Sequence, residues 1–249
     1  MTQTEDASLR TVVVAVAANL LTAVAKAVAA LLTGSAAMLA ETTHSIADTL
    51  NEVLLYVGVR RGARPADERH PFGYGQARYA WSLLAAVGIF VVGGLFAIAV
   101  GVQTLRHPEP VTDVTVGVAV LLVSAGLEGL SWRTARRQLR AEAAARNLDL
   151  GEYLVTSSDP TPTAVFLEDS AALVGIALAL SALVLHITTG SALWDGAASL
   201  LIGLLLIVVA YMLMRRNLAL LIDEAARPTS ASGCARRWPG SRGWPRWPS

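Results

Sequence analysis

Charged residues and thiols are scarce in this chain of 249 residues. Only 16% of the residues are charged, against about 25% in an ordinary soluble domain. The single cysteine, Cys234, excludes a disulfide framework within one chain, and it leaves the apolar segments without the thiolate that a copper(I) site would need. The net charge of +1 gives no reason to expect a nucleic-acid partner.

Apolar residues are abundant, at 54% of the chain, and the mean hydropathy is +0.51. Six apolar runs are long enough to cross a hydrocarbon core of about 30 Å as helices of about 20 residues. The sequence therefore predicts an all-α membrane protein that spans the lipid bilayer as a bundle of six transmembrane helices. These helices are expected near residues 12–32, 36–59, 80–105, 114–130, 164–187 and 193–213.

Nineteen of the twenty basic residues are arginines, and they gather in alternate connections. They follow the second, fourth and sixth apolar runs, whereas the short loops between the other runs contain only Arg106. The positive-inside rule then places both termini in the cytoplasm. The start of the chain lacks the basic region and cleavage site of a signal peptide, so the first run should remain as a spanning helix. The absence of a targeting presequence favours a prokaryotic plasma membrane.

The domain organisation follows from these runs. We expect a cytoplasmic N-terminus over residues 1–11 and a transport domain over residues 12–224. Residues 133–150 are good helix formers that should extend the fourth helix into the cytoplasm, and the segment from Ser157 to Pro162 should end it. Residues 225–249 turn to Pro, Ser, Gly, Arg and Trp with no apolar period, which predicts a disordered tail more than a segment lying on lipid.

Ionisable residues within the second apolar run mark the candidate functional region. Glu41, His44 and Asp48 are spaced i, i+3 and i+7, so they share one helix face, and Glu52 extends that face by a turn. A charge at mid-bilayer depth costs at least about 2.5 kcal/mol even on the most lenient insertion scale, which favours a transport role. The structural alternative is a buried ion pair of His44 and Asp48, closed by Lys26.

Polar residues on other predicted helices could face this row. The first helix has a polar stripe of Asn19, Thr22 and Lys26, and the fifth has Glu168 and Asp169 close to its start. Imidazole nitrogen and carboxylate oxygen together suit zinc, iron, cobalt or manganese. The residues therefore predict a site for a transported divalent metal ion, with no resident cofactor and no enzymatic activity.

Several motifs resemble the cation diffusion facilitator family of zinc and related metal transporters. The similar segments are Thr33-Gly-Ser35, the run from Glu41 to Asp48, and Asp67-Glu-Arg-His70-Pro-Phe-Gly, and the similarity continues over roughly residues 12–224. The resemblance implies a six-helix transporter, commonly a homodimer, that exchanges a cytoplasmic divalent metal for protons. It also implies that His44, Asp48 and Asp169 form the central metal site.

The chain departs from the family pattern at the fourth ligand. Val165 stands where many members have a histidine, so Glu168 is the nearest substitute, either as a ligand or as a proton acceptor. Adjacent helical positions differ in direction by about 100 degrees, so Glu168 and Asp169 should point differently. A site richer in carboxylates would accept manganese, iron or cobalt more readily than one with a second histidine.

Two further departures lie outside the predicted helices. Asp67 and His70 match a loop metal site of some members, but Tyr74 occupies the place of a further histidine. With two ligands left, we favour a structural role for this pair over metal binding. Members usually follow the sixth helix with a cytoplasmic domain of ferredoxin-like fold, and the residues after Glu224 do not have the composition to form one.

Competition between metal and protons supplies a mechanism. A bound divalent ion requires a neutral histidine and ionised carboxylates, so metal binding should release protons and protonation should eject the metal. The sequence thus predicts metal/proton antiport that exports a divalent cation, with zinc as the first candidate and Mn²⁺, Fe²⁺ or Co²⁺ as alternatives. Two rivals are a truncated, non-transporting membrane subunit that associates with intact relatives, and a transporter of an organic cation.

Overall fold

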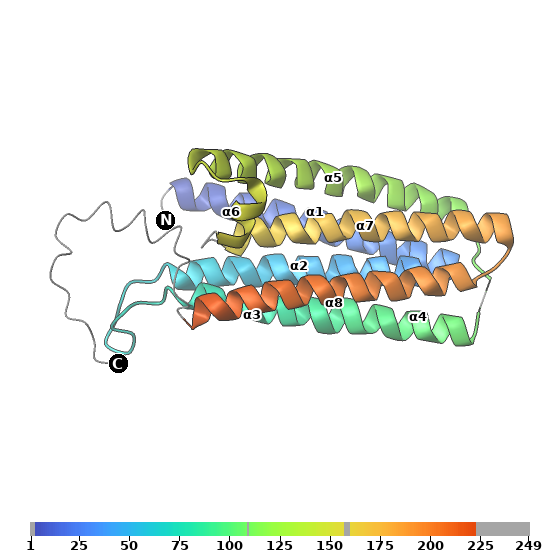
Figure 1. The fold of residues 1–249 in the computed structure, drawn as a ribbon, viewed down its shortest axis with the longest axis horizontal. Helices are drawn as coiled ribbons and strands as arrows, with labels where there is room; N and C mark the ends of the chain where they lie inside the picture. Colours follow the sequence, from blue (N-terminus) through green and yellow to red (C-terminus); the bar gives the residue numbers. More distant parts are fainter. Residues whose placement is uncertain (1–2, 109, 157–159, 223–249) are drawn as a thin grey trace.

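Six long helical segments run side by side in the computed structural model, which describes residues 3–108, 110–156 and 160–222 (Figure 1). The third is one continuous rod in which a π-helical stretch, η1, joins two α-helices, and the short helix α6 lies at one end of the bundle. The all-α, six-helix prediction is therefore confirmed. The elements are α1 (Gln3–Thr33), α2 (Ala36–Gly62), α3 (Ala77–Gly88), η1 (Ile89–Leu95), α4 (Phe96–Arg106), α5 (Val114–Ala145), α6 (Leu150–Thr156), α7 (Pro160–Thr189) and α8 (Leu193–Leu221).

Apolar composition distinguishes α2 from the other long segments. Within the described residues, α1, the α3 to α4 rod, α5, α7 and α8 are long and apolar enough to cross a membrane by length and composition. The 27 residues of α2 include Glu41, Asp48 and Glu52, which lower its hydropathy. It packs against α1, the α3 to α4 rod, α7 and α8, and its first half is almost wholly buried. The apolar helices therefore shield the polar one from lipid, as a spanning polar helix requires.

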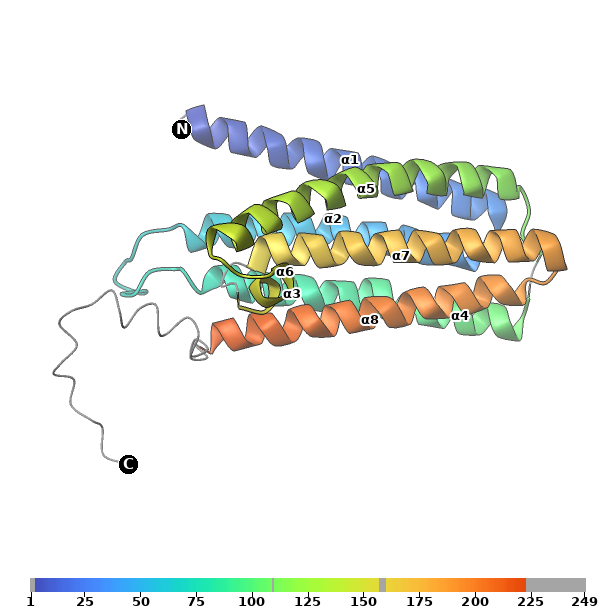
Figure 2. The same cartoon turned by 45° about the horizontal axis from the view of Figure 1, so that its top comes forward.

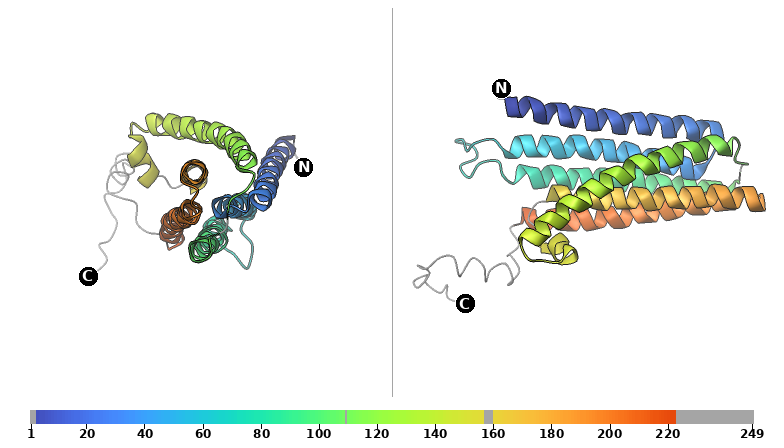
Figure 3. Two further views of the ribbon diagram at one scale, coloured as in Figure 1. Left: turned by 90° about the vertical axis from the view of Figure 1, so that its right-hand side faces the viewer. Right: turned by 90° about the horizontal axis from the view of Figure 1, so that it is seen from above.

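The connections segregate to the two ends of the bundle. The α2–α3 loop, α6, the start of α1 and the end of α8 all lie at one end (Figures 1 and 2). This end collects the arginine-rich connections, as the sequence predicts, and we call it the Arg-rich end. Viewed end-on, α7 lies between α5 and α8, while α2 lies beside α1 (Figure 3). The N-terminal part of α1 diverges from α2 towards the Arg-rich end (Figure 2).

Several helices extend beyond the predicted apolar runs. Helix α1 begins at Gln3 rather than near residue 12, and α8 continues to Leu221, past the predicted end at residue 213. Helix α5 does extend beyond the apolar run, to Ala145, but it ends before Asn147, whose positive φ of 55° cannot continue a right-handed helix. Helix α5 therefore ends before the expected breaker segment from Ser157 to Pro162, and α6 lies between the two. Residues 157–159 and the predicted tail at 225–249 lie outside the described residues.

Small residues allow the α3 to α4 rod to approach α8 closely. A Cβ atom added to Gly101 would lie 2.8 Å from the backbone nitrogen of Leu200 and 2.9 Å from the carbonyl oxygen of Gly196. Nearby, the Ser199 hydroxyl donates a hydrogen bond to the carbonyl oxygen of Ala97 at 2.9 Å. Close backbone contact between small residues is the usual way in which helices associate in lipid.

We expect Gly101→Ala to destabilise the bundle by about 1–3 kcal/mol, because two rigid backbones would have to separate. The matched control is Gly126→Ala on α5, where a Cβ atom meets nothing within 4 Å. That substitution should be neutral or slightly stabilising, because alanine stabilises a helix by about 1 kcal/mol relative to glycine. Thermal unfolding of both variants in detergent gives the comparison, and equal unfolding temperatures would contradict the close packing.

Candidate metal site

His44 is buried inside the helix bundle. Its side chain is 1% exposed, and Nε2 lies 3.5 Å from Asp48 Oδ2, one turn along α2. Among the described residues, neither ring nitrogen of His44 has a hydrogen-bond partner, and Asp48 Oδ1 also has none. Buried polar atoms are almost always paired, so such a group calls for an explanation, and the capacity to bind an ion is one. This pair is the centre of the candidate site.

The first turn of α2 is fixed by a carboxylate from another helix. Asp195, near the start of α8, accepts hydrogen bonds from the Ser35 hydroxyl and from the backbone N–H groups of Ala36 and Ala37. Ser35 in turn accepts from the N–H of Met38 at 3.1 Å, as a helix N-cap does. These bonds satisfy the free amides of the first turn and tie the position of α2 to α8. They lie at the end of the bundle opposite the Arg-rich end.

The polar stripe of α1 faces the acidic row of α2, as predicted, but through particular pairs. Lys26 Nζ lies 3.0 Å from Glu41 Oε2, and both side chains are fully buried. Asn19, nearer the Arg-rich end, hydrogen-bonds to Glu52. Thr22 does not take part, because its hydroxyl donates to the carbonyl oxygen of Ala18 in its own helix. Lys26 therefore pairs with Glu41 and does not close the pair of His44 and Asp48.

The two carboxylates of α7 point to different neighbours. Glu168 is buried and accepts a hydrogen bond from the amide of Asn51 on α2, and its other oxygen, Oε1, has no partner within the part of the chain that the structure describes. Asp169 accepts from the hydroxyl of Ser131 on α5 at 2.7 Å. Electrostatic interactions join both residues to Asp48. The divergence predicted from the helical spacing is therefore observed, and each carboxylate is held by one polar side chain.

Glu128 on α5 is a further acidic residue near the site that the sequence analysis does not select. It lies four residues after Ser124, which is buried, and three before Ser131, which binds Asp169, so it belongs to the inward face of α5. It interacts electrostatically with Asp48, Lys26 and His44. The sequence feature that could have identified Glu128 was an ionisable residue inside a predicted span. Glu128 lies two residues before the predicted end of that span at residue 130.

The predicted ligands are neighbours, but they are not gathered around one point. Within the described residues, no three His, Cys, Asp or Glu side chains are grouped so that they could hold a metal ion. His44 and Asp48 come from α2, whereas Glu168 and Asp169 come from α7 and are engaged by Asn51 and Ser131. Metal coordination by Asp169 through Oδ2 would replace its hydrogen bond from Ser131, whereas Glu168 could coordinate through Oε1 while it keeps its hydrogen bond from Asn51.

The α2–α3 loop is organised around Asp67. The Tyr74 hydroxyl donates to Asp67 Oδ2 at 2.7 Å, and the backbone N–H groups of Arg69 and His70 donate to Oδ1 at 3.0 and 2.7 Å. The His70 and Tyr74 rings also contact each other at a tilt of 34°, with centroids 4.1 Å apart. The Tyr74 hydrogen bond, followed by the backbone bond from His70, holds the pKa of Asp67 below its usual value. This arrangement supports the structural role that we favour for Asp67 and His70.

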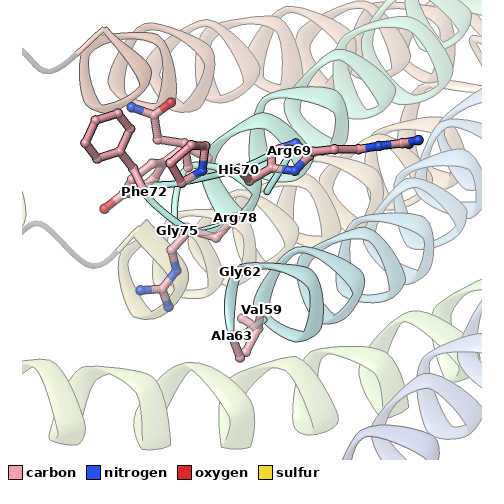
Figure 4. Close-up of a pocket in the computed structure, with 12 residues that line it drawn as sticks. Val59, Gly62, Ala63, Arg69, His70, Phe72, Gly75 and Arg78 are labelled. Atoms are coloured by element: carbon pink, nitrogen blue, oxygen red, sulfur yellow. The ribbon is translucent and has the colours of Figure 1, made fainter. Parts of the chain in front are cut away.

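A cavity of about 930 Å³ opens beside this loop at the Arg-rich end (Figure 4). Phe72 on its rim is fully exposed, and none of the central residues of the candidate site lines it. The cavity is therefore separate from the site around His44. Its lining comes from the end of α2, the loop and the start of α3, and includes Val59, Gly62, Arg69, His70, Arg78 and Tyr79.

We expect Asp67→Asn to loosen the loop at neutral pH, because an amide accepts hydrogen bonds more weakly than a carboxylate. Amide hydrogen exchange should rise over residues 67–75, while metal binding should not change. In the unsubstituted chain the lowered pKa of Asp67 adds stability above the usual aspartate value, and this contribution is lost as pH falls through the lowered value. A loss of bound zinc in Asp67→Asn would instead indicate a loop metal site.

Sequence comparisons with known proteins match most of this chain. The sequence profile described as the cation efflux transmembrane domain matches residues 12–222. The chain is 36% identical over 219 residues to the mitochondrial proton-coupled zinc antiporter SLC30A9 of Xenopus laevis, covering 88% of this chain and 39% of that protein. It is 37% identical over 188 residues to metal tolerance protein C4 of Arabidopsis thaliana, covering 76% of this chain and 41% of that protein. It thus spans about two fifths of the length of these relatives.

Proposed function

The chain belongs to the cation efflux, or cation diffusion facilitator, family, which comprises transporters rather than enzymes, and from this premise we propose that it exports a divalent transition metal in exchange for protons. Zinc is the proposed substrate, because relatives named as zinc antiporters match most of the chain. That this chain has the full activity of these relatives is a proposal, because the match covers 39% of their length.

The observation that carries the proposal is the unpartnered imidazole of His44 beside Asp48 in the central helix. Burial of an imidazole without a hydrogen bond is costly, and a metal ion or a proton would satisfy it. Imidazole nitrogen and carboxylate oxygen are the ligands that zinc takes when thiolates are absent. Carboxylates alone could bind an organic cation, so transport of an organic cation would not explain a histidine at this position.

We propose that His44, Asp48 and Asp169 bind the metal and that a third carboxylate completes the site as its fourth ligand. Glu168 is the predicted fourth ligand, and its free Oε1 is available for that role. Glu128 approaches the same pair from α5 and serves as the alternative. Ser131 and Asn51 are the hydrogen-bond partners that would orient the α7 carboxylates towards a bound ion.

Proton exchange offsets the electrical work of export. Moving a divalent cation outward against a potential of about 100 mV costs about 4.6 kcal/mol, twice the value for one charge. One returning proton offsets half of this amount and adds the free energy of the pH gradient. The proton would bind where the metal leaves, because the imidazole and carboxylates that coordinate the ion are the groups that become protonated.

The assembly and orientation are also proposals. We infer that the Arg-rich end faces the cytoplasm, by the positive-inside rule, which places both ends of the transport domain on that side. A prokaryotic plasma membrane and a homodimer, as the family resemblance implies, complete the proposal. Rocking of the helix bundle would expose the site alternately to the two sides of the membrane.

Substitution of the central ligands should abolish metal flux. In sealed vesicles with a pH gradient, we expect His44→Ala and Asp169→Asn to lower zinc transport by at least about 100-fold, because each removes a ligand. The control is His107→Ala, which alters an exposed histidine at the end of α4. Equal transport by all four proteins would remove the central-site assignment. Dimerisation of the unsubstituted chain without flux would favour the non-transporting alternative.

Zinc binding should release protons and tighten as pH rises. Neutral imidazole and ionised carboxylates bind the metal, so the apparent affinity should increase between about pH 6 and about pH 8. Calorimetric titration in buffers of different ionisation enthalpy counts the released protons, and a chelator should reverse the binding. An affinity that does not change with pH would contradict competition for one site.

A further inference from the structure

Glu41 has the position and chemistry of a metal ligand, yet it is held by a lysine. It lies one turn before His44 on the same face of α2, where its carboxylate could join the metal site. Its partner, Lys26, is the only lysine in the sequence, and both side chains are fully buried. The proposed transport mechanism gives no role to either residue.

The contacts fix this pair within the bundle. Lys26 Nζ lies 3.0 Å from Glu41 Oε2 and donates a second hydrogen bond to Ser45 Oγ at 2.9 Å. The other carboxylate oxygen, Oε1, has no hydrogen-bond partner and occupies space beside Gly175 of α7, where a Cβ atom would collide with it. Glu41 is therefore enclosed by α1, α2 and α7. Ser45 directly follows His44, so the ammonium group lies next to the metal-binding turn.

Stability is a weak explanation for the pair. The free-energy cost of desolvating two buried charges often outweighs their attraction. An apolar pair of similar size commonly stabilises a core equally well. The lysine also acts beyond Glu41, because it interacts electrostatically with Asp48 and with Glu128. A fixed positive charge here opposes a divalent ion, and the carboxylate of Glu41 attracts one.

We propose that Lys26 is a specificity-determining residue that withholds Glu41 from the metal and cancels its charge. This inference rests on the proposed function, because it assigns a role beside the site proposed there. With Glu41 withheld, the site keeps one imidazole and a limited number of carboxylates, which suits zinc. Release of Glu41 would add an oxygen ligand and a negative charge, which favours manganese, an ion that prefers carboxylate oxygen.

The decisive expectation is that the two single variants shift metal affinity in opposite directions. Lys26→Met should raise the affinity for both metals, by about tenfold for zinc and by more for manganese, because the released carboxylate attracts them. Glu41→Gln should lower zinc affinity by about tenfold, because the lysine charge is then uncompensated. The double variant Lys26→Met/Glu41→Gln restores neutrality and should return within about threefold of the unsubstituted chain.

The experiment titrates the purified full chain with zinc alone and manganese alone, and measures uptake of both ions into vesicles. Ser45→Ala is the matched control, since it removes one hydrogen bond of Lys26 without changing any charge, and it should shift zinc affinity by less than about threefold. If Lys26→Met does not fold, the comparison of Glu41→Gln with the double variant still tests the charge of Lys26. The double variant should then bind zinc about tenfold more tightly.

Two results would overturn the inference. One is a loss of affinity in both single variants without recovery in the double variant, which is the pattern of a structural pair. The other is an unchanged ratio of manganese to zinc uptake in Lys26→Met. Both results require that the unsubstituted chain binds and transports zinc. Absence of zinc binding in that chain would contradict the proposed function instead, so the two failures are distinguishable.

Discussion

The structure depends on one constraint, that polar groups inside a hydrocarbon layer must find their partners within the protein. Helix α2 places a row of ionisable residues along most of its length, and it can do so because apolar helices surround it. Each of those helices meets this demand differently. Helix α1 contributes a lysine, and α7 contributes carboxylates that have their own amide and hydroxyl partners. Helix α8 contributes Asp195, which binds the first turn of α2.

The partners are unevenly distributed along α2. Near its start, Asp195 and the pair of Lys26 and Glu41 form well-defined bonds among fully buried residues. From His44 towards the Arg-rich end, several buried nitrogen and oxygen atoms have no partner, and Asp48 becomes 16% exposed. The first turns of the helix are thus fixed by internal bonds, with Glu41 Oε1 as the exception among the described residues, and the part from His44 onwards retains more free coordinating atoms. This division is what a transporter needs, a rigid support beside a site that an ion can enter and leave.

The carboxylates around His44 also explain why one site could carry both metal and protons. Acidic residues from α2, α5 and α7 interact electrostatically within one region, and the fixed positive charge of Lys26 lies among them. Such a cluster is least favourable when it is empty and fully ionised, because like charges repel in a medium of low dielectric constant. Its occupation by either a divalent ion or protons lowers that repulsion, which is the physical basis for the proposed exchange.

The sequence by itself determined the six long helical segments, the segregation of arginines to one end, and the row of Glu41, His44 and Asp48. These features depend on hydropathy and helical periodicity, which are local properties. Tertiary structure alone decided that Lys26 binds Glu41, that Asn51 and Ser131 hold the α7 carboxylates, and that Glu128 faces the site. Such pairings depend on how helices rotate and approach one another, and the spacing of residues along one helix does not specify that geometry.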